Sequence, residues 1–219
     1  MTLKSKIEST KEAVIHNNKG YLLNSQGRYE DAIKEFDAAI KSNPQNAVAH
    51  YNKALALLDL NKYEDAIKEC DAAISINPNN SNYRGSKGYA LNLLRKYEDA
   101  IKEFDAAIKL NKNTYAYNNK GNALGLLGKH KESIKQYNAA LKINPNFAPA
   151  IYNKGVALEH LGNYKEAIKQ FDKAIELVPN EEQYHKSREN AIKILKEKQK
   201  RVNKKVTKYK FISKFFTRH

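Results

Sequence analysis

EDAIKEFDAAI, at Glu30–Ile40, is written again and again along the chain. It returns as EDAIKECDAAI from residue 64 and as EDAIKEFDAAI from residue 98, and the looser copies KESIKQYNAAL and KEAIKQFDKAI begin at residues 131 and 165. Successive copies start 34, 34, 33 and 34 residues apart. A fixed period of this size predicts a solenoid of helix–turn–helix units, in which the core lies between neighbouring units.

The period divides most of the chain into five predicted units with two helical segments in each. The units are 13–46, 47–80, 81–113, 114–147 and 148–181. In the second unit, Ala54, Leu57 and Leu58 follow helical spacing and predict a first helix near residues 48–60. A second helix is expected over 63–76, where Pro78 shortly afterwards prevents it from continuing.

The ends of the chain depart from the period. Residues 1–12 are predicted to be a lead-in or an extension of the first helix, residues 182–200 a capping helix, and residues 201–219 a basic aromatic tail. The third unit is one residue short and has Lys112 where the other four units have proline, so its junction with the fourth unit is expected to be the least regular.

One slot between the two helices of each unit favours residues that adopt a left-handed backbone. Its occupants are Gly27, Asn61, Arg95, Gly128 and Gly162. Glycine and asparagine commonly end helices in this conformation, so Arg95 is expected to be strained or to lie in a different turn.

Small residues recur at three further slots of the unit, where closely crossing helices would need them. The eighth slot holds Gly20, Ala54, Gly88, Gly121 and Gly155; the twentieth holds Ala32, Ala66, Ala100, Ser133 and Ala167; the twenty-seventh holds Ala39, Ala73, Ala107, Ala140 and Ala174. This pattern resembles the tetratricopeptide repeat (TPR) over about residues 13–181. The resemblance implies an all-α, right-handed superhelical solenoid of five TPR units plus a C-terminal capping helix.

The resemblance also implies that the first helices line a concave groove that binds a peptide or protein segment. The sixth slot forms an asparagine ladder of Asn18, Asn52, Asn119 and Asn153, with Ser86 in the third unit. It resembles the ladder by which superhelical members of the family hold a peptide backbone, because an amide can both donate and accept a hydrogen bond. The alternative is that these amides support helix packing. The other predicted groove residues are Asn17, Tyr21, Tyr51, Tyr89, Asn92, Tyr115, Asn118, Asn122 and Tyr152.

The charges of the predicted groove restrict its ligand. Members of the family that bind chaperones carry cations at defined groove slots, but those slots hold Asn17, Tyr51 and Gly85 in the first three units. We therefore predict no carboxylate clamp. The groove favours a neutral or weakly polar segment, with tyrosines as rigid contact area. Asp59 and Glu159 are the formal charges expected there.

A second ladder stands at the seventh slot, beside the asparagines. It consists of Lys19, Lys53, Lys87, Lys120 and Lys154. Either it forms a cationic strip at the groove edge, or the lysine stems cover apolar surface while their ammonium groups reach water.

Catalytic, metal and cofactor sites are not expected. The six histidines show no metal-ligand spacing, and no glycine loop has the pattern of a phosphate cradle. Acidic pairs such as Glu30–Asp31 stand at helix starts, where negative charge is favourable. Cys70 is the only cysteine and replaces an aromatic residue of the other copies, so we predict a buried thiol and no intrachain disulfide.

Most of the net charge of +15 lies near the C-terminus. Residues 182–219 hold 13 Lys/Arg and 3 Asp/Glu, a net of +10. The tail can be a solvated, partly disordered end, an anchor on anionic membranes, or less readily a nucleic-acid contact. Its predicted contacts to an anionic surface are Lys204, Lys205, Lys208, Lys210, Lys214, Phe215 and Phe216.

These patterns predict a non-enzymatic scaffold that binds a protein or peptide in its groove. The alternative is a peripheral membrane adaptor that uses the tail. The N-terminus shows no apolar segment typical of a secretory signal, and no run reaches the ~18–20 apolar residues of a membrane span. The expected location is cytoplasmic.

Overall fold

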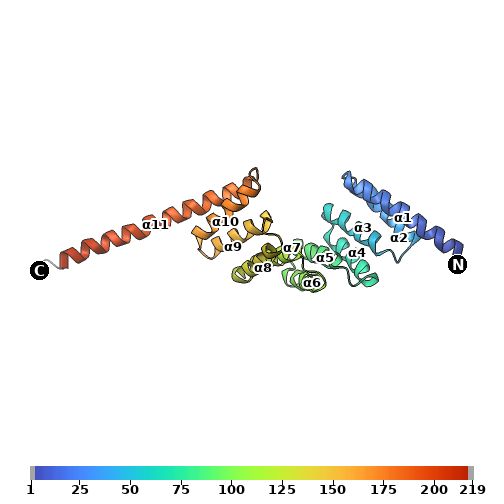
Figure 1. Ribbon diagram of the computed structural model, residues 1–219, viewed down its shortest axis with the longest axis horizontal. Coiled ribbons are helices and arrows are strands. Elements are labelled where there is room, and N and C mark those ends of the chain that lie inside the picture. Colours follow the sequence, from blue (N-terminus) through green and yellow to red (C-terminus); the bar gives the residue numbers. More distant parts are fainter. Residues whose placement is uncertain (1–2, 217–219) are drawn as a thin grey trace. The chain divides into compact units, whose positions relative to one another are not determined.

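The computed structural model describes the backbone of residues 3–216 and the side chains of residues 8–206. All regular structure in this range is α-helical, which confirms the all-α prediction (Figure 1). The helices are α1 (Leu3–Ser25), α2 (Tyr29–Ser42), α3 (Ala47–Asp59), α4 (Tyr63–Ile76), α5 (Ser81–Leu93), α6 (Tyr97–Leu110), α7 (Thr114–Leu126), α8 (His130–Ile143), α9 (Ala148–His160), α10 (Tyr164–Leu177) and α11 (Glu182–Phe216). Up to α10, odd numbers are the first helices of the repeats and even numbers the second.

The second helices form where the repeated sequence places small and aromatic residues on one face. In α2, Ala32, Phe36 and Ala39 are buried at spacings of four and three residues, while Glu30 and Asp31 lie in the first turn. Negative charge is favourable at that end of a helix. The sequence repeated most faithfully therefore forms a packing element.

Three of the first helices, α3, α5 and α7, are held at both ends by local chemistry. Asn46, Asn80 and Asn113 precede α3, α5 and α7, and each accepts a backbone hydrogen bond from the first turn of its helix. At the other end, the predicted left-handed slot is confirmed in all five turns. The φ angles are 75°, 58°, 60°, 74° and 77° at Gly27, Asn61, Arg95, Gly128 and Gly162.

Contacts between Cα atoms divide the chain into two compact units, residues 1–127 and 128–219. In the first unit, α1 to α7 pack against their neighbours in order, and two of its apolar clusters are centred on Phe36 and Phe104. In the second unit, Phe171 and Ile151 are fully buried among α8 to α11.

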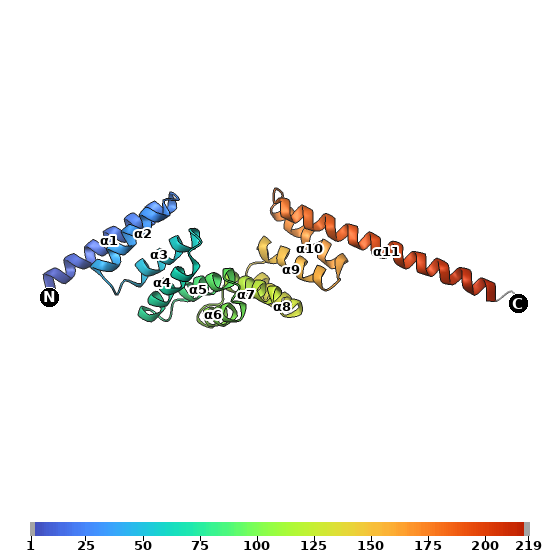
Figure 2. The same ribbon diagram turned by 180° about the vertical axis from the view of Figure 1, so that it is seen from behind.

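The helix α11 covers the end of the second unit and then continues beyond it. Tyr184 and Ala191 are buried against α9 and α10. Figures 1 and 2 both show the distal part of α11 extending away from these helices. Residues 182–216 form one uninterrupted helix, with no break at residue 200 where the sequence suggested that a tail begins.

Candidate functional site

The first helices of the first unit line a cavity of about 620 Å³. Its walls come mainly from α3, α5 and α7, with one residue each from α1 and α6 and two from the loop between α6 and α7. The lining residues are Asn24, Tyr51, Leu55, Leu58, Asp59, Ser81, Asn82, Gly85, Ser86, Tyr89, Phe104, Asn111, Asn113, Tyr115, Ala116 and Asn119.

Three predicted tyrosines and one amide of the predicted ladder meet at this cavity. Tyr89 is 44% exposed and Tyr115 is 68% exposed, so both side chains are accessible to an incoming ligand. Tyr51 is half-buried and rests on Tyr83, with ring centroids 4.8 Å apart. Asn119 adds an amide beside them.

The described polar groups of the cavity are amides, hydroxyls and one carboxylate, without a cation. Asp59 is the single formally charged residue in the lining, and no lysine or arginine of the described residues belongs to it. Asn24 contributes a buried Oδ1 atom that has no hydrogen-bond partner among the described residues. A ligand that donates hydrogen bonds therefore suits this wall.

Other members of the predicted ladder bond to neighbouring first helices. Asn52 Nδ2 donates to Asn17 Oδ1 at 3.0 Å, and Ser86 Oγ donates to Tyr51 Oη at 3.4 Å. Both contacts join residues 35 apart, one helix to the next. One amide hydrogen of Asn52 thus links two repeats, as the packing alternative supposes.

The remaining predicted groove residues of the first unit lie outside the cavity. Asn18, Tyr21 and Asn122 are exposed on α1 and α7. Asn92 and Asn118 are buried, each with an exposed fraction of 8%. Asn92 Oδ1 has no hydrogen-bond partner in the described part of the chain.

In the second unit, α11 lies against the predicted groove residue of α9. Tyr152 stacks on Tyr184 with ring centroids 4.6 Å apart, and its hydroxyl lies 3.0 Å from Ser187 Oγ. This contact again spans 35 residues. Tyr152 therefore packs α11 onto the repeats, while Asn153 beside it is half-buried on α9.

Loop and helix-start residues of the cavity were missed in the sequence. These are Ser81 and Asn82 at the start of α5, and Asn111 and Asn113 before α7. The signal in the sequence was the third repeat (81–113), which is one residue short. Its second helix is joined to α7 by a loop of three residues, and Asn111 and Asn113 of that loop lie in the cavity wall.

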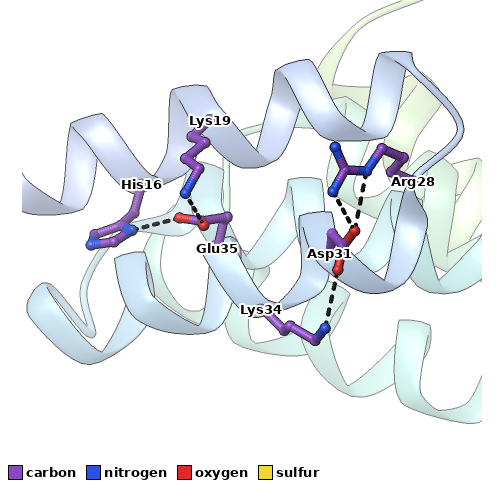
Figure 3. Close-up of polar contacts among 6 residues, drawn as sticks. All are labelled: His16, Lys19, Arg28, Asp31, Lys34 and Glu35. Carbon is purple, nitrogen blue, oxygen red and sulfur yellow. Dashed lines mark hydrogen bonds and ion pairs between the residues drawn. The ribbon is translucent and has the colours of Figure 1, made fainter.

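Four lysines of the ladder form ion pairs with the second helices, which neither sequence interpretation anticipated; they are Lys19, Lys53, Lys87 and Lys120. Figure 3 shows Lys19 and His16 of α1 on the two oxygens of Glu35 in α2. The distances are 2.6 Å from Lys19 Nζ to Oε1 and 2.7 Å from His16 Nδ1 to Oε2. The same figure shows a separate exposed trio, with Asp31 between Arg28 and Lys34.

In the next two repeats each lysine connects two second helices. Lys53 Nζ lies 2.7 Å from both Asp37 and Glu69, and the Lys53 side chain is only 18% exposed. Lys87 bridges Asp71 and Glu103 in the same way, at 2.8 Å. Lys53 and Lys87 thus tie neighbouring repeats together.

These ion pairs shift the ionisation of their members. Burial alone would raise the pKa of Glu69, but hydrogen bonds from Lys53 and His50 outweigh it and hold the pKa below its usual value. For Lys53 burial acts to lower the pKa, and bonds to Asp37 and Glu69 reverse the effect and raise it. Both side chains are therefore charged at neutral pH.

Models described as tetratricopeptide repeat match residues 17–81, 82–114, 114–147 and 148–181. The chain belongs to the tetratricopeptide-repeat family. No curated protein sequence matches it significantly.

Solved TPR structures resemble the chain over most of its length. YrrB, described as a TPR protein with an unusual peptide-binding site, is 26% identical, with a TM-score of 0.66 over 86% of this chain and 98% of that one. MamA is 25% identical, with a TM-score of 0.67 over 80% and 96%. A thermophilic TPR protein of Thermus thermophilus is 21% identical, with a TM-score of 0.67 over 82% and 98%, and supports the fold.

The described part of this TPR chain shows no metal centre and no reactive thiol. No group of three or more His, Cys, Asp or Glu residues is placed to hold a metal ion there. His130 and His160 stack with ring centroids 4.5 Å apart, and burial followed by the His160 charge lowers the pKa of His130. Cys70 is buried as predicted, which raises the pKa of its thiol to about 12.

The distal part of α11 carries the predicted basic surface. Lys204 and Lys205 are exposed, and so are Val202 and Val206, at 57% and 46%. The side chains of the other predicted contacts lie outside the described residues: Lys208, Lys210, Lys214, Phe215 and Phe216. Among the helices described, none has both the length and the apolar character that crossing a membrane requires.

Proposed function

We propose that this protein is a non-enzymatic scaffold whose first unit binds an extended segment of a partner protein in the cavity between its first helices. Membership of the TPR family supports a protein-interaction role. The observation that carries the proposal is a single cavity in which the exposed rings of Tyr89 and Tyr115 stand beside the amide of Asn119.

The chemistry of the cavity fits a peptide better than a compact small molecule. Tyrosines supply large rigid contact area at a low entropic cost, and amides pair with backbone groups without reading side chains. YrrB, similar to this chain over most of its length, is described as having a peptide-binding site. We infer the same class of ligand here.

A displayed library of random peptides, each about twelve residues long, tests the proposal. Full-length protein is immobilised, binders are enriched, and the affinities of individual peptides are measured by fluorescence anisotropy. Tyr89→Ala and Asn119→Ala are expected to weaken binding by about tenfold each, since the loss of one well-packed contact costs on the order of 1.4 kcal/mol. Far-ultraviolet circular dichroism should stay unchanged, because both side chains face the cavity.

The matched control is Lys68→Ala, which removes a long exposed side chain from the second helix α4, outside the cavity. It should leave peptide affinity unchanged. Selected peptides that bind the two cavity variants as tightly as the wild type would contradict the proposal.

A second role, as a peripheral membrane adaptor, is favoured by the distal part of α11. That helix continues without a break to Phe216 and exposes Val202 and Val206 among lysines. A basic helix with an apolar stripe can lie on an anionic membrane, where each nearby cation contributes about 1 kcal/mol.

Sedimentation with liposomes tests this role. Full-length protein should sediment with vesicles rich in phosphatidylserine but not with phosphatidylcholine vesicles, and a version ending at Lys196 should stay in the supernatant. Equal sedimentation of the two versions on anionic vesicles would remove the adaptor hypothesis.

A further inference from the structure

We propose that the cavity of the first unit selects segments that carry an arginine or lysine side chain, which it holds between its tyrosines and Asp59. This inference rests on the proposed function and specifies the chemistry of the partner. It differs from the neutral or weakly polar ligand that the sequence suggested.

The charge of the cavity is the first argument. Asp59 is exposed at the C-terminal end of α3, lines the cavity and forms no ion pair within the described part of the chain. A carboxylate that is free inside a concave, partly apolar wall attracts cations more strongly than one on an open surface. The cavity thus offers one unsatisfied negative charge.

The ladder lysines on α3, α5 and α7, the helices that form most of the cavity wall, are already paired elsewhere. Lys53 and Lys87 each bridge two carboxylates, and Lys120 bonds to Asp105 at 2.5 Å. None of the three belongs to the cavity lining. An acidic segment would therefore meet Asp59 without a compensating cation, and like charges at short range disfavour such a ligand.

The aromatic rings are the second argument. Tyr51, Tyr89 and Tyr115 line the same cavity as Asp59. Tyrosine faces attract ammonium and guanidinium groups through the ring quadrupole, and arginine can also stack on them. Three rings and one carboxylate in a single cavity form a site for a cationic side chain.

The buried amide oxygen of Asn24 is the third argument. Asn24 lines the cavity, and its buried Oδ1 atom has no hydrogen-bond partner among the described residues. A buried acceptor without a donor is costly, and a ligand that donates to it removes that cost. Arginine carries five N–H donors and lysine three, so either residue can supply the missing bond.

A double-mutant cycle on a selected peptide tests the inference. Peptides from the random library are sequenced, and arginine and lysine are expected to be enriched over the input pool. In one enriched peptide the basic residue is replaced by glutamine. This should weaken binding to the wild type by about tenfold but should have little effect on binding to Asp59→Asn, because the carboxylate and the cation act as one pair.

The control variant is Glu64→Gln, which removes an exposed carboxylate of the same repeat outside the cavity. It should behave like the wild type in the cycle, and raising the salt concentration should weaken binding of the basic peptide only while Asp59 is present.

The outcomes separate the two proposals. Two results would overturn the cation inference and leave the scaffold role standing. One is that the peptides depend on Tyr89 for binding but show no enrichment in arginine or lysine. The other is that replacing the basic residue lowers the affinity for the wild type and for Asp59→Asn equally. A library that yields no peptide sensitive to Tyr89→Ala would overturn the groove proposal itself.

Discussion

The eighth slot of each repeat is matched in volume to an aromatic slot in the following helix. A Cβ atom on Gly88 would lie 2.8 Å from Phe104 Cε1, closer than carbon atoms approach without a shift. In the second repeat the larger residue, Ala54, stands opposite the smaller one, Cys70, and both are fully buried. Compared with Gly88 and Phe104, the residue on the first helix is larger and the residue on the second helix is smaller, so the two changes compensate in volume. A close-packed interior tolerates neither overlap nor a void.

This exchange predicts that the two positions are energetically coupled. Cys70→Phe alone should lower the free energy of unfolding by about 1–3 kcal/mol, because the ring would press on the Ala54 methyl group. Adding Ala54→Gly should restore most of the loss, since it recreates the Gly88–Phe104 pair. Urea denaturation of the four proteins measures the coupling, and strictly additive effects would contradict it.

The carboxylate of Glu69 shows how ion pairs between helices depend on pH. Its folded pKa is held below the ordinary value of 4.5, so its contribution to stability is present above pH 4.5 and is lost as the pH falls through the folded pKa. The same slot holds Gln136 and Gln170 in the last two repeats, so glutamine fits there sterically.

We expect Glu69→Gln to lower the free energy of unfolding at pH 7 by about 1.5–3 kcal/mol, the range for a hydrogen bond to a charged group. The difference from the wild type should shrink below pH 4.5. Denaturant titrations from about pH 3 to 7 measure it, with the exposed Asp65→Asn as a control that should barely change the midpoint. A difference that stays constant through this range would refute the assignment.

At the scale of single elements, the turns between helices share one backbone geometry but not one residue. Arg95 has a φ of 60°, in the left-handed region where its side chain is strained, whereas three of the other turns use glycine. A left-handed conformation costs an ordinary residue about 1–2 kcal/mol, and glycine avoids this cost. Part of that advantage is lost because glycine has more conformational freedom in the unfolded chain.

Arg95→Gly is therefore expected to raise the free energy of unfolding by about 0.5–1 kcal/mol, the balance of these two effects. Asn61→Gly should have a smaller effect, because asparagine adopts this conformation more readily. Thermal unfolding followed by circular dichroism compares the two. A lower midpoint for Arg95→Gly would mean that the arginine side chain stabilises the turn by more than its strain costs.

At the scale of the whole molecule, α11 is both the cover of the second unit and the carrier of the basic segment. Its proximal part buries Tyr184 and Ala191 against α9 and α10, and Arg188 bonds to Asp172. Farther along, Lys198 lies over the Tyr164 ring, 4.4 Å from its centroid. Repeat stability is set by nearest neighbours, so the cover should stabilise mainly the helices that it touches.

Two truncations separate these roles. A chain ending at Glu181 is expected to exchange amide hydrogens much faster in α9 and α10, because it exposes Tyr152 and its apolar surroundings. A chain ending at Lys196 keeps Tyr184 and Ala191 and should stay close to the wild type. Hydrogen exchange read by mass spectrometry measures both, with α1 to α4 as the internal reference. Equal exchange in the two truncated chains would show that the cover contributes little.

The features that follow from local sequence could be predicted. The helices and the turn residues depend on chain neighbours and on small residues at fixed spacing, and the period and the buried Cys70 follow from comparing one copy with the next. The resemblance to the TPR family had also placed Tyr51, Tyr89 and Tyr115 on the groove side of the first helices, and they line the cavity. The predicted boundary between a capping helix and a tail at residue 200 rested on no helix-ending residue, and α11 continues past it without a break.

The partners of the recurring polar residues were decided by the tertiary structure. The sequence alone shows that a lysine recurs at the seventh slot, but not that Lys53 reaches carboxylates on two second helices. Nor does it show that Tyr152 lies under α11, or that a short loop brings Asn111 to the cavity. Helix spacing fixes which face a residue occupies within its own repeat. The position of one repeat relative to the next depends on how the side chains of neighbouring helix pairs pack together. That packing decides which residues 35 apart in the sequence come into contact.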